Sequence, residues 1–238
     1  MMAATSTDIQ HTIIWIVIPA LAVLIPGLLT LFMRPGPRLT SAMQHLAAGL
    51  IMAAVTVELV PETLKDIDSK WPAIAGYVAG LVMVFAIRQV SRQMDEDSPG
   101  GLLATVFIDV TLDGFLVGIS LVTIAGTGVA ILIGSLSVEV AFLVMATIGT
   151  LLSRRWKRHR VILVVTAMSI ATLGGGLLGF IGAGSLPPAM LSAATAFGVA
   201  ALVYLVVEEL LVEAHKENAD TTLGSLMFFV GFGVPIFA

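Results

Sequence analysis

Cysteine is absent from the 238 residues, which excludes disulfide bonds, iron–sulfur clusters and thiolate metal sites. Charged residues are scarce too, at 12% of the chain against roughly 25% in a typical soluble domain. What the chain has instead is apolar: 58% of its residues are hydrophobic, and its mean hydropathy is +1.02. A soluble protein of this length could not bury so much apolar surface. We therefore predict an all-α polytopic membrane protein that is surrounded by lipid.

Several other classes of protein are excluded by what is missing. The net charge of −4 and a single short basic run argue against binding of nucleic acid. No Ser/His/Asp arrangement, His-Glu-x-x-His motif or phosphate loop is present, so we do not expect an enzyme. The first ten residues carry no Lys or Arg, so no cleavable signal peptide is expected.

A helix needs about 20 residues to cross the hydrocarbon core of a bilayer. Eight stretches are long and apolar enough, and they are expected at 12–32, 41–61, 73–90, 102–124, 128–152, 161–183, 189–213 and 221–237. The connections between them are short and hold most of the turn and charged residues. Residues 1–238 are therefore predicted to form a single transmembrane bundle of about eight helices.

The basic residues predict how this bundle is oriented. Ten of the twelve Lys and Arg lie in or beside the odd-numbered connections, and only Lys65 and Lys70 lie in even-numbered ones. Because Lys and Arg near span ends prefer the cytoplasm, we expect both termini outside a cell membrane, whether plasma or inner membrane. An even number of spans agrees with this.

Charged side chains inside the expected spans are all acidic. They are Glu58 and Glu62 in the second span, Asp109 and Asp113 in the fourth, Glu139 in the fifth, and Glu208, Glu209 and Glu213 in the seventh. No Lys or Arg is expected deep in a span, so salt bridges are not expected to neutralise these acids. Acids buried in a membrane without such partners must hold either protons or a cation.

Helix geometry places the two central acids at one depth. With about 1.5 Å of rise per residue, Asp113 and Glu139 each lie roughly 16 Å into their spans, near the midplane of a core about 30 Å thick. Asp109 and Ser135 each lie one turn away on the same face, and Met52 reaches the same level. We expect these five residues to form a cation site. The open alternatives are protonated, hydrogen-bonded carboxyls and, for Met52, simple packing.

The remaining acids are expected to line a path through the membrane. Glu58 and Glu62 lie at the outer end of the second span, and Glu208 and Glu209 lie toward the inner end of the seventh. For Glu62 an ordinary interfacial position remains open. His45 and His215 lie at cytoplasmic span ends, where a released metal could be collected, but solvated surface histidines are the simpler expectation.

Two segments resemble the ZIP (Zrt/Irt-like) family of divalent-metal transporters. Residues 58–62 read Glu-Leu-Val-Pro-Glu, similar to the second-helix pattern His-x-x-Pro-Glu, with Glu58 in place of the histidine. Residues 207–215, followed by 222–224 and 231–232, resemble the end of the family's sequence almost word for word. The resemblance covers nearly the whole chain, and it implies eight helices, external termini and alternating access, with a homodimer possible.

The central helices keep less of the family's pattern. The family's fourth helix usually carries His-Asn-x-Pro-Glu/Asp-Gly, and residues 109–114 of this chain read Asp-Val-Thr-Leu-Asp-Gly. The family's fifth helix usually carries His-x-x-Pro-Glu, and residues 135–139 of this chain read Ser-Leu-Ser-Val-Glu. Val110 and Leu136 cannot bind a metal, so we expect one metal site rather than two. Both prolines are missing, so the kinks they produce are expected to be absent or supplied otherwise.

The sequence thus predicts a transporter of divalent transition-metal ions into the cytoplasm. The resemblance implies Zn²⁺ first, while a carboxylate-rich site without His or Cys also suits Fe²⁺ or Mn²⁺. Two alternatives stay open. One is a proton or cation pathway without a tight metal site, and the other is a non-transporting membrane protein on the same scaffold. Beyond the metal itself, no cofactor is expected, and membrane lipid is the other expected partner.

Overall fold

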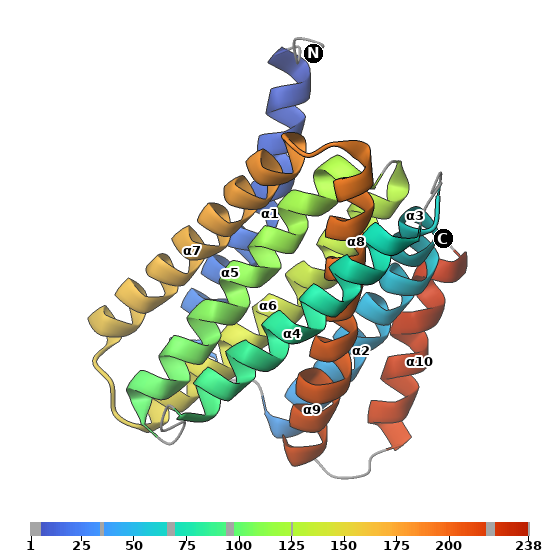
Figure 1. Ribbon diagram of the computed structural model, residues 1–238. Coiled ribbons are helices and arrows are strands. Elements are labelled where there is room, and N and C mark those ends of the chain that lie inside the picture. Colours follow the sequence, from blue (N-terminus) through green and yellow to red (C-terminus); the bar gives the residue numbers. More distant parts are fainter. Residues whose placement is uncertain are drawn as a thin grey trace.

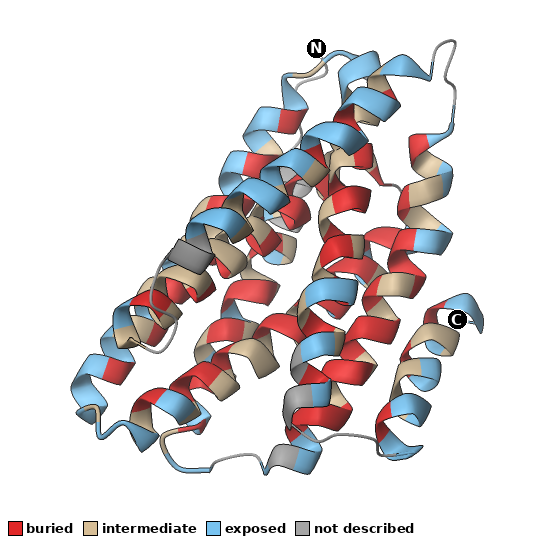
Figure 2. Cartoon of the chain, turned by 60° about the horizontal axis from the view of Figure 1, so that its bottom comes forward, coloured by how far each residue is buried: buried red, intermediate tan, exposed pale blue. Residues whose placement is uncertain are grey.

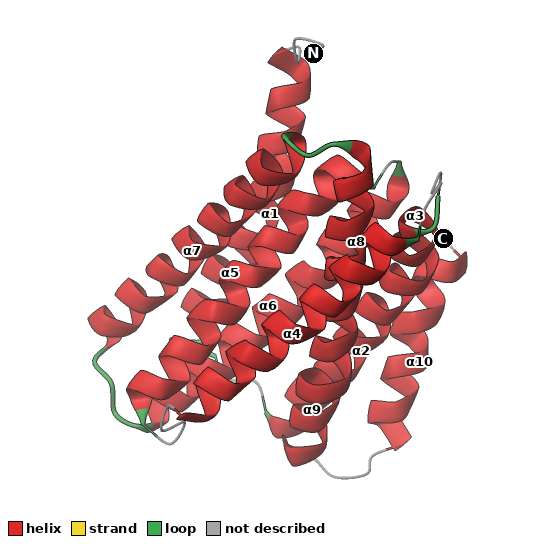
Figure 3. Cartoon of the chain, viewed as in Figure 1, coloured by secondary structure: helices red, strands yellow, loops and turns green. Residues whose placement is uncertain are grey.

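The described residues form a bundle of long helices and contain no strand (Figure 3). The computed structural model describes residues 6–33, 36–65, 70–93, 98–124, 126–217 and 222–237. Its helices are α1 Ser6–Leu29, α2 Pro37–Ala54, η1 Val55–Leu59, α3 Val60–Thr63, α4 Trp71–Gln93, α5 Pro99–Thr123, α6 Thr127–Ser153, α7 Arg158–Gly184, α8 Pro188–Tyr204, η2 Leu205–Leu210, α9 Leu211–Glu217 and α10 Thr222–Phe237.

These elements confirm the all-α membrane bundle. Helices α2, η1 and α3 follow one another without a break, as do α8, η2 and α9, so the described residues form eight continuous helical segments. Seven are long and apolar enough to span a membrane, and α10 is a shorter apolar helix of 16 residues. In Figure 1, α1 begins at the top of the view, and α10 ends at the right, beside α3. We call the end of the bundle that holds the odd-numbered connections the basic end.

The helices pack as two groups. The α5 group contains α1, α5, α6 and α7, with α5 packed along α7 and α1 against both α6 and α7. The α2 group contains α2, α4, α8 and α10 with their short continuations, and here α2 packs along α10 and α4 along α8. The two groups meet mainly where α2 touches α6 and where α5 touches α8. Any site between α5, α6 and α8 therefore lies at the boundary of two separately packed units.

Glycines allow the closest helix pairs to form. A Cβ atom at Gly114 of α5 would overlap the carbonyl oxygen of Thr172 in α7, and one at Gly179 of α7 would overlap that of Phe115. Gly49 of α2 has the same relation to Phe228 of α10. Small residues let helix backbones approach closely in lipid, where apolar burial gives no driving force for association. Packing is therefore the role of these glycines.

Burial follows the pattern expected of a bundle in lipid. Buried residues gather between the helices, and exposed ones cover the outside (Figure 2). The exposed side chains include large apolar residues on α4 and α7, such as Val82 at 63% and Leu163 at 72% of their maximal exposure. Apolar side chains on the outer surface of a soluble protein would be costly, but they are solvated by lipid tails in a membrane.

Two short π-helical segments interrupt two of the long helical segments at acidic residues. η1 contains Glu58, and η2 contains Glu208 and Glu209. A π-helical turn adds one residue per turn, shifts the register of the side chains that follow and is frequent at functional sites. By contrast, α5 and α6 run as unbroken α-helices, in agreement with the loss of proline from both.

Candidate functional site

A cavity of about 450 Å³ lies at the boundary between the two helix groups. Its lining comes from α5 and α6 on one side and from α2, α4, α8, η2 and α9 on the other. The lining residues extend from Asp113 and Glu139, in the middle of their helices, toward Leu102 and Thr150 near the basic end. On the far side of Asp113 and Glu139, the bundle is closed by packed apolar residues that include Leu132 and Leu136. We call this space the carboxylate cavity.

The floor of the carboxylate cavity is a pair of buried acids. Asp113 of α5 is 3% exposed and Glu139 of α6 is 2% exposed, and their carboxyl groups are in side-chain hydrogen-bonding contact. Two ionised carboxylates in such contact repel each other strongly when they are away from water. The pair therefore requires either a shared proton or a bound cation. This brings together the two acids that helix geometry placed at one depth.

Two further acids lie close to this pair. Asp109, one turn from Asp113, and Glu209 of η2 both line the carboxylate cavity, and both are near enough to interact electrostatically with the pair. The four acids do not close into a ligand shell. Among the described residues, no three His, Cys, Asp or Glu side chains converge as metal ligands do. A cation at the floor would therefore complete its coordination with water or neutral oxygen atoms.

Unpaired polar atoms mark the same cavity. Within the described part of the chain, four buried side-chain polar atoms lack a hydrogen-bond partner: Gln44 Oε1, Thr105 Oγ1, Asp113 Oδ2 and Glu139 Oε2. All four residues line the carboxylate cavity, and all four atoms are oxygens. A buried polar atom without a partner is costly and indicates an ion or water bound nearby. Sequence reasoning missed Gln44 and Thr105, although Thr105 lies one turn before Asp109.

A basic residue faces the carboxylate cavity, contrary to the expectation that none would neutralise the acids. Arg88 of α4 forms an ion pair with Glu208, donates a hydrogen bond of 2.7 Å to the Tyr204 hydroxyl and lies over the Tyr204 ring. Its long side chain extends from α4 toward η2, so that the guanidinium group lies at Glu208. The side chains of Arg88 and Glu208 are 30% and 46% exposed, so the pair lies at the more accessible part of the cavity.

Two of the sequence-predicted ligands lie elsewhere. Ser135 is buried, but its hydroxyl donates to the Ile131 carbonyl of its own helix at 2.7 Å, and the residue does not line the carboxylate cavity. Met52 packs against the apolar cluster that includes Ile51 and Leu136. The structure thus brings Asp109, Asp113 and Glu139 to one cavity but leaves Ser135 and Met52 outside it.

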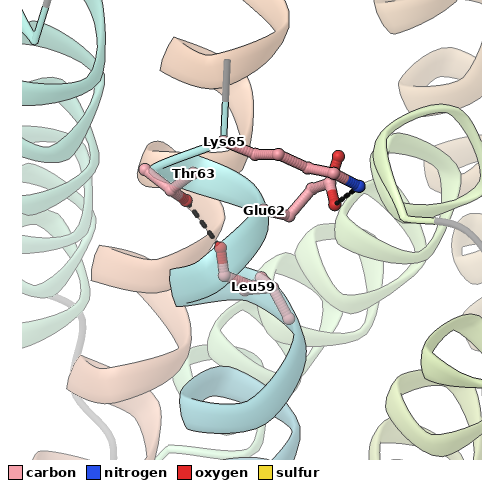
Figure 4. Close-up of polar contacts among 4 residues, drawn as sticks. All are labelled: Leu59, Glu62, Thr63 and Lys65. Carbon is pink, nitrogen blue, oxygen red and sulfur yellow. Dashed lines mark hydrogen bonds and ion pairs between the residues drawn. The ribbon is translucent and has the colours of Figure 1, made fainter. Parts of the chain in front are cut away.

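The outer acids are separated from the carboxylate cavity by the apolar cluster. Glu62 pairs with Lys65 at 3.3 Å, beside the Thr63 hydroxyl that donates to the Leu59 carbonyl (Figure 4). Glu58 lies against Gly128, in the first turn of α6, because a Cβ atom there would overlap its carboxylate. Neither acid is among the residues that line the cavity.

One of the two histidines, His45, differs from the expectation of a solvated surface residue. His45 is only 6% exposed, because the start of α2 is covered by α9 and α10. Its ring centre lies 5.2 Å from that of His215. His215 itself is exposed, as expected. The side chain of Glu213 lies outside the described residues.

Comparison with known proteins adds no assignment. No family model matches the chain, and no curated protein shows a significant match to it. Function must therefore be inferred from the cavity and from the residues that line it.

Proposed function

We propose that the protein is a membrane transporter that moves a divalent transition-metal ion into the cytoplasm through the carboxylate cavity. Zn²⁺ is the first candidate, with Fe²⁺ and Mn²⁺ as alternatives, and the chain would be a divergent member of the ZIP family in a cell membrane. Asp113 and Glu139 would hold the ion at the floor. Asp109 and Glu209 would contribute negative charge to it and receive it on the way to the basic end.

The observation that carries this proposal is the convergence of unpaired oxygens. Every buried, unpartnered side-chain polar atom in the described residues is an oxygen that lines one cavity, and two of these oxygens belong to the acids at its floor. A cation at the floor would remove the repulsion between the two acids and give Asp113 Oδ2 and Glu139 Oε2 a partner. Carboxylate and neutral oxygens suit Mn²⁺ and Fe²⁺, and Zn²⁺ also binds carboxylates well.

The arrangement of the two helix groups supports transport rather than permanent binding. The floor acids lie on α5 and α6, whereas Glu208 and Glu209 lie on η2 in the other group. Movement of one group relative to the other would change the distance between these acids and so change the affinity for the ion. Because bound carboxylates must be deprotonated, protons that return to Asp113 and Glu139 would favour release.

Uptake of ⁶⁵Zn²⁺ into liposomes that contain the purified chain tests the proposal. The double variant Asp113→Asn/Glu139→Gln keeps side-chain size and is expected to lose uptake. Thr111→Val is the matched control on α5, because the Thr111 hydroxyl bonds the Phe107 carbonyl of its own helix and does not line the cavity. Undiminished uptake by the double variant would reject the proposed site, and competition by Mn²⁺ or Fe²⁺ would rank the substrates.

A proton pathway is the second candidate, because no three ligating side chains converge among the described residues. A chain of acids can pass protons without a tight metal site. Liposomes loaded with a pH-sensitive dye separate the two functions. Proton flux without any metal that is abolished by Glu139→Gln would favour this candidate, whereas proton movement that requires Zn²⁺ would favour metal transport.

A further inference from the structure

His45 and His215 form a pair outside the carboxylate cavity, although each lies close to its wall. His45 follows Gln44, which lines the cavity from α2, and His215 lies three residues after Val212, which lines it from α9. The imidazole of His45 lies against Gly224 of α10, where a Cβ atom would approach its Cε1 atom to 3.0 Å. The pair therefore occupies the junction of α2, α9 and α10, near the basic end.

The two rings present the same nitrogen for binding. The Nδ1 atom of His45 lies 2.8 Å from the Ser41 carbonyl, and that of His215 lies 2.5 Å from the Leu211 carbonyl. A carbonyl can only accept, so Nδ1 must carry the proton in both rings, and a neutral ring then has its lone pair on Nε2. A histidine that binds a metal through Nε2 usually donates Nδ1–H to a carbonyl or carboxylate in this way.

The spacing of the rings fits an ion bound between them. A metal ion lies about 2 Å from a ligating imidazole nitrogen, so two rings that share one ion at a roughly tetrahedral angle have centres about 5 Å apart. The observed separation is 5.2 Å, with a tilt of 54° between the ring planes.

A hydrogen bond beside the two histidines joins α2 to α9. The Ser41 hydroxyl donates to the Ala214 carbonyl at 2.9 Å, and this hydrogen bond joins α2 to α9 one turn before His45 and one residue before His215. Both partners are buried, so the relative position of the two histidines is fixed by a contact that water does not reach. The two histidines thus lie on helices that a buried hydrogen bond joins directly beside them.

We propose that His45 and His215 form a second, nitrogen-ligated site for a divalent transition metal, distinct from the carboxylate cavity. The site supplies two imidazole nitrogens and leaves the remaining coordination positions to water. It selects borderline ions such as Zn²⁺, Co²⁺ and Ni²⁺ over Mg²⁺ and Ca²⁺, which prefer oxygen. With only two protein ligands it binds weakly enough to exchange its ion with the cytoplasm. The site stands on its own geometry and does not require the carboxylate cavity to transport a metal.

The test uses the full-length chain in detergent micelles, purified with an affinity tag free of histidine, and Co²⁺ as the probe. The starting protein is Asp113→Asn/Glu139→Gln, which lacks the floor acids, so that any Co²⁺ bound reports another site. We expect one Co²⁺ per chain, detected by visible d–d absorption, and displacement of it by Zn²⁺ but not by Mg²⁺. His215→Ala is expected to weaken Co²⁺ binding at least tenfold, and His45→Ala is expected to do the same.

His159→Ala is the matched control, because His159 is an exposed histidine of α7 at the same end of the bundle. It should leave Co²⁺ binding unchanged. Since His215 is exposed, its removal should not unfold the chain, and a thermal melt checks this. If the double variant does not fold, wild type is used, and His215→Ala should lower the stoichiometry from two Co²⁺ to one. Co²⁺ binding that survives His215→Ala, or no binding to the folded double variant, overturns the proposal. Loss of transport alone leaves it standing.

Discussion

Replacing Asp113 by Asn separates two effects of the acid pair: the repulsion that destabilises the metal-free chain and the stabilisation that a bound metal provides. If both carboxylates were ionised about 4 Å apart, they would repel by about 4 kcal/mol at an effective dielectric constant of about 20. The Asn amide has the same shape and can donate a hydrogen bond to Glu139, so the repulsion is removed without a cavity. We therefore expect the metal-free variant to be at least as stable as metal-free wild type.

The same substitution should remove stabilisation by metal. An ion present at 100 times its dissociation constant stabilises the folded state by about 2.7 kcal/mol. For a chain of this size, each kcal/mol shifts the melting temperature by roughly 2–4 °C. We expect Zn²⁺ to raise the melting temperature of wild type by about 5–10 °C and that of Asp113→Asn by less than about 2 °C. A fluorescence melt of the purified chain, with and without Zn²⁺, measures both values.

Glu62→Gln is the control for this experiment, because Glu62 is also a carboxylate but pairs with Lys65 outside the carboxylate cavity. It should keep the full shift with Zn²⁺. To exclude a contribution from the histidine pair, the melts are repeated in His215→Ala. The reasoning is refuted if Asp113→Asn melts well below metal-free wild type and still gains the full shift, since Asp113 would then be a structural residue.

Three further predictions follow from the packing and the polar contacts. Arg88→Gln should change the melting temperature by less than about 4 °C, because a partly exposed ion pair contributes at most about 1 kcal/mol. It should raise Zn²⁺ affinity in calorimetry, since a competing positive charge leaves the cavity, and unchanged affinity would exclude that competition. Gly114→Ala should lower the melting temperature by several degrees, because its Cβ would overlap the Thr172 carbonyl. Gly134→Ala is the control and should not lower it, because a Cβ there would meet nothing within 4 Å. Equal effects of the two variants would contradict the close packing of α5 on α7. Ser135→Ala should leave ⁶⁵Zn²⁺ uptake unchanged, because its hydroxyl bonds its own helix; a large loss would return Ser135 to the site.

Much of the architecture was predictable from the sequence. Hydropathy is a strong signal, because every span must satisfy its backbone inside the membrane. The eight expected stretches correspond to eight continuous helical segments in the described residues, and the largest discrepancy is the start of α1 at Ser6 rather than at residue 12. Helix depth also brought Asp113 and Glu139 to one level, because rise per residue is nearly constant in a straight helix.

What the sequence did not predict depends on how each helix is rotated about its axis and on how far long side chains extend. Residues at one depth can point in different directions, and a helix's rotation is set by its neighbours. Ser135 lies one turn from Glu139, yet its hydroxyl bonds its own helix, and Met52 joins an apolar cluster. Arg88 lies near the end of the expected span 73–90, and only the structure shows that its long side chain reaches Glu208. The burial of His45 required knowledge that α9 and α10 cover the start of α2.

The central claim is that Asp113 and Glu139 hold a divalent metal ion together. Anomalous-scattering maps of crystals soaked separately in Zn²⁺ and Mn²⁺ test it most directly. We predict a peak about 2 Å from a carboxylate oxygen of each residue, the bond length of Zn²⁺ to carboxylates. Maps that show metal at the histidine pair or at the surface, but none at the floor of the accessible cavity, would contradict the claim.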